Sequence, residues 1–335
     1  MDAKNSIALN DLLKWGIEHT TASEDAPPTT APRPEPLDPK WVDIILGKPD
    51  AVRMRDCMSA MTAPATDLSA RTAAADELEM LVEQIDNAMD LKACKLWSPL
   101  FAVQRDMTVE PEMRMYANWI VATAVQNNPK AAKDWQDAGG LDVLVDAVRV
   151  RETEDPAVVA KLVAIVSALT SLSPEFIALM HSRGILADLA ALLQLSPRHA
   201  SSKRVLHMLA YLLDAAPKLA LLFAAPGWMA RAVRVQIEGL VPASISTTTD
   251  SAEADEEGDD LGVDMDHLEK ALRFVVTVSR ALAEPGKSVA AWPMRPDEYR
   301  WVQEQAHAAV KRDKDAIEPE LVAELDALVA EVYSQ

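Results

Sequence analysis

Three prolines recur at nearly constant intervals along the middle of the chain, each at the end of a stretch with helical periodicity. Pro129, Pro174 and Pro217 lie 45 and 43 residues apart. After each proline come a short helical pattern, a turn that contains glycine and a leucine-rich helical pattern. Repeats of this length bury their apolar faces by stacking on their neighbours. The spacing therefore predicts an all-α repeat structure rather than a closed globule.

The turns between these helical segments keep the same interval. Gly140, Gly184 and Gly227 follow one another after 44 and 43 residues, and residues 96–100 occupy the equivalent place one repeat earlier without a glycine. A period of 43–45 residues with three helices is typical of armadillo and HEAT repeats. We expect a right-handed α-solenoid of about four to five repeats, with helical caps formed by residues 41–61 and 298–333.

The best-defined helical pattern covers residues 112–129 and shows two faces. Its core stripe consists of Met113, Ala117, Ile120, Val121 and Ala124. A second face with the same period consists of Glu112, Tyr116, Trp119 and Thr123. Further helices are expected over residues 50–61, 68–87 and 265–283. Third helices of successive repeats should line a concave groove, so this second face is a candidate binding surface.

Composition supports helices and excludes several classes of function. Glycine occurs only 10 times, and the net charge of −19 opposes binding to nucleic acid because phosphates would be repelled. The two cysteines, Cys57 and Cys94, have no metal-ligand spacing and suggest a reducing compartment. We expect no secretory signal, no membrane span and no membrane partner, and thus a location in the cytosol, with the nucleus as a second compartment.

The N-terminal part of the chain differs from the repeats. Residues 1–20 predict a mobile amphipathic arm, with Leu12, Leu13 and Ile17 on one stripe and Trp15 beside it. A short isolated helix is marginal in water, so the arm should dock on something at least transiently. Residues 21–37 form a proline-rich linker, and residues 38–335 form the repeat domain.

An acidic insertion interrupts the repeats at residues 242–264. Nine acidic residues and no Lys or Arg lie between Asp250 and Asp266. The composition predicts disorder, either as a solvated loop or as a segment with a partner. The spacing of a calcium-binding loop is absent.

No pattern in the sequence indicates catalysis. The histidines are not in a metal-binding arrangement, no glycine-rich phosphate loop is present, and neither cysteine adjoins a plausible base. We therefore predict a protein that is not an enzyme and that has no catalytic residue, metal ion or cofactor.

Superposing the third helices on their prolines extends the candidate surface. It adds Lys161 in the next repeat and Arg204 and His207 in the one after that, while Ala117 lies between core and groove. Aromatic residues and arginine are favoured at interfaces, and a local basic patch could attract an acidic partner. Two alternatives stay open: Trp119 could pack between repeats, and Lys161 and Arg204 could be solvated charges paired with nearby carboxylates.

Four segments in combination carry a resemblance to a known family. They are residues 12–19 (Leu-Leu-Lys-Trp-Gly-Ile-Glu-His), 37–41 (Leu-Asp-Pro-Lys-Trp), 85–91 (Ile-Asp-Asn-Ala-Met-Asp-Leu) and 96–100 (Leu-Trp-Ser-Pro-Leu). The chain resembles the armadillo-type nucleotide-exchange factors of the cytosolic heat-shock-70 chaperones. The resemblance implies a co-chaperone whose concave face clasps the chaperone's nucleotide-binding domain, so that ADP and then the client are released. A monomer is the simplest expectation for the chain.

The resemblance also implies roles for particular residues. Matching the contact helices of the family places Ala117, Trp119, Lys161 and Arg204 on the interface, and the arm is expected to enter the chaperone's peptide-binding cleft in place of a client. The alternative is an armadillo scaffold or adaptor that binds another protein or peptide in its groove. A Trp-x-x-x-Asn ladder, typical of transport receptors, is missing, because Thr123 stands where that asparagine would follow Trp119.

Overall fold

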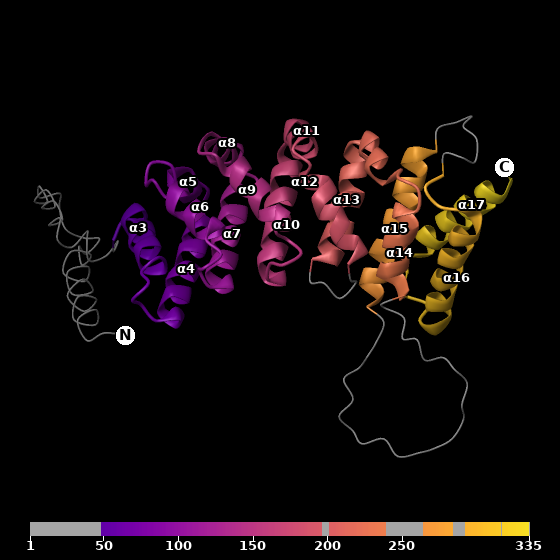
Figure 1. Cartoon of the computed structure of the whole chain (residues 1–335), viewed down its shortest axis with the longest axis horizontal. Coiled ribbons are helices and arrows are strands. Elements are labelled where there is room, and N and C mark those ends of the chain that lie inside the picture. The colour runs from indigo at the N-terminus through magenta and orange to yellow at the C-terminus, as the bar shows by residue number, and fades with distance from the viewer. Residues whose placement is uncertain (1–47, 196–200, 239–263, 284–291, 316, 335) are drawn as a thin grey trace, which may run out of the picture. The chain divides into compact units, whose positions relative to one another are not determined.

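Helices form every regular element of the part of the chain that the structure describes (Figure 1). The computed structural model describes residues 48–195, 201–238, 264–283, 292–315 and 317–334. The elements, with 3-10 helices written η, are α3 (Asp50–Met61), α4 (Leu68–Val82), α5 (Ile85–Asp90), α6 (Trp97–Arg105), α7 (Pro111–Val125), α8 (Pro129–Asp137), α9 (Gly140–Arg149), α10 (Pro156–Leu172), α11 (Pro174–Ser182), α12 (Ile185–Ala191), η1 (Leu192–Gln194), α13 (Ser202–Ala215), η2 (Pro217–Phe223), α14 (Trp228–Glu238), α15 (Met265–Leu282), α16 (Pro296–Arg312) and α17 (Pro319–Ser334).

Some sequence-based predictions concern residues outside these ranges. The arm over 1–20, the linker over 21–37 and the acidic insertion over 242–263 are not described. The helices from α3 onward belong to one unit that begins at Pro49.

The recurring prolines begin the first helix of a repeat rather than ending the third helix of the previous one. The helix expected over 112–129 ends at Val125, because Gln126 is extended with ψ 122° and Asn127 takes a positive φ of 53°. Pro129 then occupies the first turn of α8, and the Asn128 side chain accepts a hydrogen bond from the amide of Ala131 at 3.1 Å. A proline at this position needs no amide partner and has the φ of a helix.

The long helix predicted over 68–87 is wrong in its C-terminal part. α4 ends at Val82, and α5 starts at Ile85 after Gln84 turns into an extended conformation with ψ 124°. The Asn87 side chain donates hydrogen bonds to the Leu81 carbonyl at 2.9 Å and to Asp50 Oδ2 at 3.1 Å. These tertiary contacts stabilise the break, which neither a glycine nor a proline marks in the sequence.

The turn before the second helix of each repeat requires a left-handed residue. Gly139, Gly184 and Gly227 have φ values of 92°, 76° and 71°. In the repeat that lacks the glycine, Lys95 takes the same conformation with φ 60°. The backbone of the turn is therefore preserved although the residue that favours it is absent.

Third helices of successive repeats pack against one another along the unit (Figure 1). α7 packs between α4 and α10, and α13 contacts both α10 and α15. Ala117 and Ala124 of α7 have no exposed surface. Small side chains at buried positions let neighbouring helices approach closely. The stripe that periodicity assigned to the core is thus confirmed.

Helices at the two ends of the described unit cover its terminal repeats. α3 packs on α4 and α5, whereas α16 and α17 pair with each other and contact α15. Tyr299 of α16 is fully buried, and its hydroxyl lies 2.6 Å from that of Ser279 on α15. α16 and α17 occupy the position expected for the C-terminal cap, and α3 occupies that of the N-terminal cap, whose residues 41–47 lie outside the described ranges.

Candidate partner-binding site

The aromatic and basic residues that the sequence singles out lie on the third helices α7, α10 and α13. Tyr116 and Trp119 are half-buried on α7, Lys161 is half-buried on α10, and Arg204 and His207 are exposed on α13. Because these three helices follow one another side by side, residues more than 80 positions apart in sequence share one surface. We call Tyr116, Trp119, Lys161 and Arg204 the aromatic–basic cluster.

Trp119 lies at the centre of this cluster. Its ring stacks on that of Tyr116, with centroids 5.7 Å apart and an angle of 20° between the planes. The ammonium nitrogen of Lys161 lies 3.2 Å from the centroid of the Trp119 ring, which is a cation–π contact. Trp119 therefore joins α7 to α10 and also keeps part of its surface exposed.

The charge of Lys161 is held in an unfavourable environment. Burial lowers the pKa of its ammonium group, the neighbouring Arg204 lowers it further, and Glu79 partly opposes both effects. Arg204 itself donates a hydrogen bond to the carbonyl of Ala160 at 3.2 Å. No carboxylate in the described residues forms an ion pair with Lys161 or Arg204 within 4 Å. The alternative that these cations are paired with nearby acids is therefore not supported for either of them.

A shallow, more acidic hollow adjoins the cluster on α4 and α7. It has a volume of about 530 Å³ and is lined by Leu68, Ser69, Thr72, Ala73, Asp76, Glu112 and Tyr116. The Tyr116 hydroxyl donates to Asp76 at 3.4 Å, and the Thr72 hydroxyl donates to Glu112 at 3.3 Å. Burial, and after it the carboxylate of Asp76, raises the pKa of the Tyr116 hydroxyl. The candidate surface thus changes from acidic on α4 and α7 to basic on α10 and α13.

Sequence reasoning missed the contribution of α4. Asp76 and the buried Glu79, which accepts a hydrogen bond from the Thr123 hydroxyl at 2.5 Å, were not singled out. They lie 40 residues before Tyr116 and 44 residues before Thr123, close to one repeat length. Aligning α4 as the third helix of an earlier repeat would have placed them on this face.

The expectation that Ala117 touches a partner is not supported. Its side chain has no exposed surface and belongs to the core where α7 packs on its neighbours. It lies one turn from Met113 on the buried stripe, so its small size serves helix packing. The arm residues Leu12, Leu13, Trp15 and Ile17 lie outside the described residues.

Two negative findings apply to the described ranges. No group of three or more His, Cys, Asp or Glu residues there could hold a metal ion. No single helix among them is long and apolar enough to cross a membrane, although the bent pair Pro174–Ser182 and Ile185–Gln194 passes that test together by length and composition.

Comparisons with known proteins match this chain to nucleotide exchange factors of one family. The model of a family described as "Nucleotide exchange factor Fes1" matches residues 9–91. A protein of Gibberella zeae named "Hsp70 nucleotide exchange factor FES1" is 36% identical over 50% of this chain and 78% of its own length. The "Hsp70 nucleotide exchange factor fes-1" of Neurospora crassa is 32% identical over 52% of this chain and 85% of its own length.

For other relatives, the matched region is a smaller share of the relative's own length. With the FES1 protein of Yarrowia lipolytica, identity is 36% and the chain spans 54% of the relative's length, about half. Two designed armadillo repeat proteins, YIII(Dq)4CqI and YIII(Dq.V1)4CPAF, superpose with TM-scores of 0.51 and 0.50. They share 14% and 15% identity over 83% and 84% of this chain, and 99% of each of their own chains is covered. This likeness shows that the fold is an armadillo-type α-solenoid.

Proposed function

The chain belongs to the Fes1 family of nucleotide exchange factors, and we propose that it binds the nucleotide-binding domain of an Hsp70 chaperone and accelerates ADP release. The observation that carries the proposal is the identity with proteins named Hsp70 nucleotide exchange factors. Such an activity needs no covalent chemistry, and we propose that the protein acts by binding the chaperone and not as an enzyme. The client would be released after ATP replaces ADP.

The mechanism that we propose is a shift in the conformation of the chaperone. A partner that prefers an opened nucleotide-binding domain shifts the equilibrium only by its difference in affinity for the two states. A 100-fold faster release of ADP corresponds to about 2.7 kcal/mol of barrier reduction. An interface of ordinary size can supply such a difference.

The aromatic–basic cluster is our candidate for the centre of that interface. Trp119 and Tyr116 offer half-exposed aromatic surface, and Lys161 and Arg204 offer positive charge without a carboxylate partner among the described residues. We propose that acidic groups of the chaperone face α10 and α13, with His207 at the margin. Basic groups of the chaperone would face Asp76 and Glu112.

We further propose a role for the N-terminal arm. Residues 1–20 include an apolar stripe with Leu12, Leu13 and Ile17, beside Lys14 and Trp15. An apolar segment next to a lysine resembles a client peptide, so the arm would compete for the peptide-binding cleft of the chaperone. The proline-rich residues 21–37 would give it the reach to do so.

Stopped-flow measurement of fluorescent ADP release from a cytosolic Hsp70 tests the main proposal. We expect acceleration by micromolar wild-type protein and a large loss of acceleration in Arg204→Glu. Since Arg204 is exposed, this variant should keep its free energy of unfolding within about 0.5 kcal/mol of the wild type. The matched control is Arg55→Glu on α3, which makes the same charge change on an exposed residue outside the candidate surface.

Absence of any acceleration by the wild type would rule out the proposed activity. Equal losses in Arg204→Glu and Arg55→Glu would place the interface elsewhere, because the effect would then depend on net charge alone. Binding to the chaperone without acceleration would favour the scaffold alternative.

We also propose that the protein is a monomer of the cytosol, with the nucleus as a second compartment. Light scattering coupled to size-exclusion chromatography measures the mass, which should be close to 36.5 kDa. Fluorescence microscopy of a tagged full chain locates it, and enrichment in the endoplasmic reticulum or in mitochondria would contradict the placement.

A further inference from the structure

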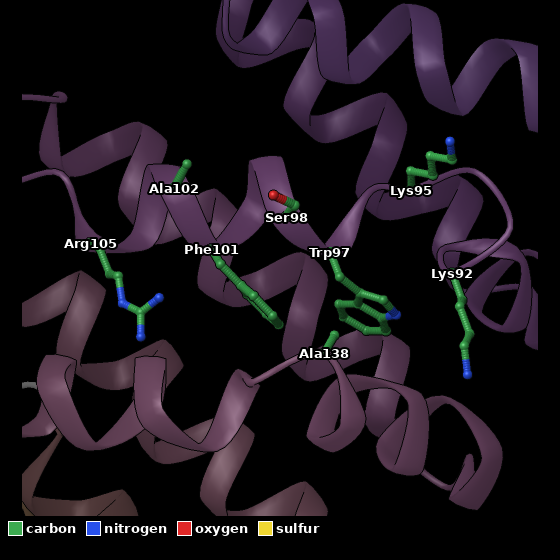
Figure 2. A pocket seen from close by; sticks show the side chains of 8 residues that line it. All are labelled: Lys92, Lys95, Trp97, Ser98, Phe101, Ala102, Arg105 and Ala138. Carbon is green, nitrogen blue, oxygen red and sulfur yellow. The ribbon is translucent and has the colours of Figure 1, made fainter.

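A basic hollow lies on the second helix of a repeat, formed by residues other than those of the third helices. It has a volume of about 510 Å³ and is lined by Lys92, Lys95, Trp97, Ser98, Phe101, Ala102, Arg105 and Ala138 (Figure 2). These residues come from the loop between α5 and α6, from α6 itself and from the end of α8. None belongs to the candidate partner-binding site, so the hollow is a separate feature.

The charge of the hollow is opposite to that of the protein. Three of its lining residues are cations and none is an acid, although the chain has a net charge of −19. Lys92 is paired with Asp134 at 2.5 Å, and Arg105 approaches Asp146 at 3.5 Å. Lys95 is exposed and forms no ion pair or hydrogen bond through its ammonium group within the described ranges. The hollow therefore offers one unpaired cation and one loosely paired cation.

The floor of the hollow holds a polar group without a partner. The Trp97 side chain is only 4% exposed and stacks on Phe101, with ring centroids 6.0 Å apart. Its indole Nε1–H has no hydrogen-bond acceptor among the described residues. In Figure 2 the indole nitrogen lies on the side of the ring toward Lys92. A buried N–H without an acceptor is unfavourable, so an acceptor from outside the chain would relieve it.

The cations are too far apart for one small anion. Lys95 lies in the turn just before α6 and Arg105 is its last residue, and a helix of nine residues that rises about 1.5 Å per residue is about 14 Å long, so the two cations flank an element of that length. An extended peptide advances about 3.3 Å per residue and covers that distance in four to five residues. Between them lie the aromatic rings of Trp97 and Phe101 and the small Ala102.

We propose that this hollow binds an extended acidic peptide segment of a partner protein. Two carboxylates separated by four to five residues would face Lys95 and Arg105. An apolar side chain between them would contact Trp97 and Phe101, and a peptide carbonyl or carboxylate would accept the indole hydrogen bond. Electrostatic complementarity of this kind favours acidic peptides over neutral or basic ones.

Fluorescence anisotropy with the full chain and a defined probe tests the site. The probe is the labelled hexapeptide Glu-Ser-Leu-Ser-Ser-Glu, and its counterpart has glutamine in place of both glutamates. We expect binding of the acidic peptide that weakens with salt, and about tenfold weaker binding of the glutamine peptide. Lys95→Glu and Arg105→Glu should each weaken binding by about tenfold, whereas Lys218→Glu, an exposed lysine of η2, should not change it. Both substituted cations are exposed, so these variants should fold.

Three further outcomes test which chemical groups the hollow recognises. Trp97→Phe keeps most of the aromatic floor but removes the N–H, so binding a few-fold weaker with unchanged thermal stability would support the indole contact. Equal affinity for the glutamine peptide would overturn the proposal. Displacement of the probe by inorganic phosphate, at an ionic strength where chloride does not displace it, would also overturn it in favour of a site for a single anion.

Discussion

At the scale of single residues, the role of a side chain depends on its backbone conformation and its burial as well as on the residue type. Lys95 takes the left-handed conformation that glycine takes at the equivalent turns, and Ala117 is buried although it adjoins the candidate surface. Trp119 is neither purely core nor purely surface, because Tyr116 and Lys161 cover only part of its ring. The position of a residue in its repeat therefore does not by itself decide whether its side chain is buried in the core or available to a partner.

The left-handed turns predict opposite effects of two substitutions. In Gly184→Ala a new Cβ would meet no atom within 4 Å, so the cost is only that of a side chain at φ 76°, about 1 kcal/mol of the free energy of unfolding. Lys95→Gly should instead raise this free energy by up to about 1 kcal/mol, because it relieves a non-glycine residue at φ 60°. Equilibrium urea denaturation measures both. A stabilised Gly184→Ala would contradict the assignment of a left-handed turn.

At the scale of elements, neighbouring repeats are tied by polar contacts between residues about one repeat length apart. Arg114 of α7 makes two hydrogen bonds to the carboxylate of Glu154, at 2.6 and 3.1 Å, and a third to the carbonyl of Val109. Both charged side chains are only 5% exposed. Gln236 of α14 similarly donates to the carbonyl of Leu193 in η1 at 2.8 Å. These contacts set how each repeat stacks on the next.

The buried pair of Arg114 and Glu154 predicts a large, non-additive loss of stability. Arg114→Met leaves a buried carboxylate without its counter-ion and should cost about 3–5 kcal/mol of the free energy of unfolding. The double variant Arg114→Met with Glu154→Leu should cost less than this single one, because no unpaired charge remains. Urea denaturation of the two singles and the double provides the cycle. Additive losses would show that the two side chains do not interact.

The start of α15 predicts a dependence of stability on pH. His267 is buried, and its Nε2 lies 2.8 Å from Gln236 Oε1. Burial lowers the pKa of His267 below its usual 6.5, against the attraction of Asp264 and together with the repulsion of Lys203. As pH falls below about 6.5, the unfolded chain therefore takes up this proton first, and stability decreases.

His267→Gln should flatten that decrease, because glutamine can form a hydrogen bond but does not titrate in this range. The measurement is the free energy of unfolding of both proteins between about pH 7 and pH 5. Other groups that titrate there are common to both, so only the difference between the two curves matters. Parallel curves would mean that His267 is equally protonated in the folded and unfolded states.

At the scale of the whole molecule, the chain combines an armadillo-type solenoid with segments outside the described residues. The solenoid presents two basic surfaces, the aromatic–basic cluster on the third helices and the hollow on α6, within a protein of net charge −19. Such local inversions of charge favour acidic partners, and salt screens the repulsion from the rest of the molecule. The arm adds a second proposed contact with the chaperone, besides the aromatic–basic cluster.

Deletion of residues 1–36 separates the proposed role of the arm from that of the solenoid. We expect an unchanged rate of ADP release, because the aromatic–basic cluster is retained, but slower release of a tightly bound peptide client. The measurements are stopped-flow ADP release and anisotropy decay of a labelled client peptide. A variant with residues 1–20 replaced by a Gly/Ser sequence of the same length controls for chain length. Unchanged rates in both assays would refute the role of the arm.

The sequence by itself determined the fold class, the repeat length and most of the core. Prolines at the start and glycines in the turn of each repeat act through local backbone preferences, and the apolar stripe of α7 follows from the helical period, so both can be read without knowledge of the neighbours. The family resemblance also rests on short local segments. Even so, the sequence did not show the end of α4 at Val82 or the left-handed turn at Lys95, since tertiary contacts and turn geometry override local preference there.

Only the tertiary structure decided which side chains meet across repeats. Lys161 lies over Trp119, Asp76 and Glu79 reach α7, and Arg204 reaches Ala160, in each case over 40 to 44 residues of sequence. These contacts depend on the side-by-side packing of the third helices, which no local pattern specifies. The burial of Ala117 and the buried, unpaired indole N–H of Trp97 have the same origin. Exposure and pairing are properties of the stacked repeats, whereas helical periodicity is a property of each one alone.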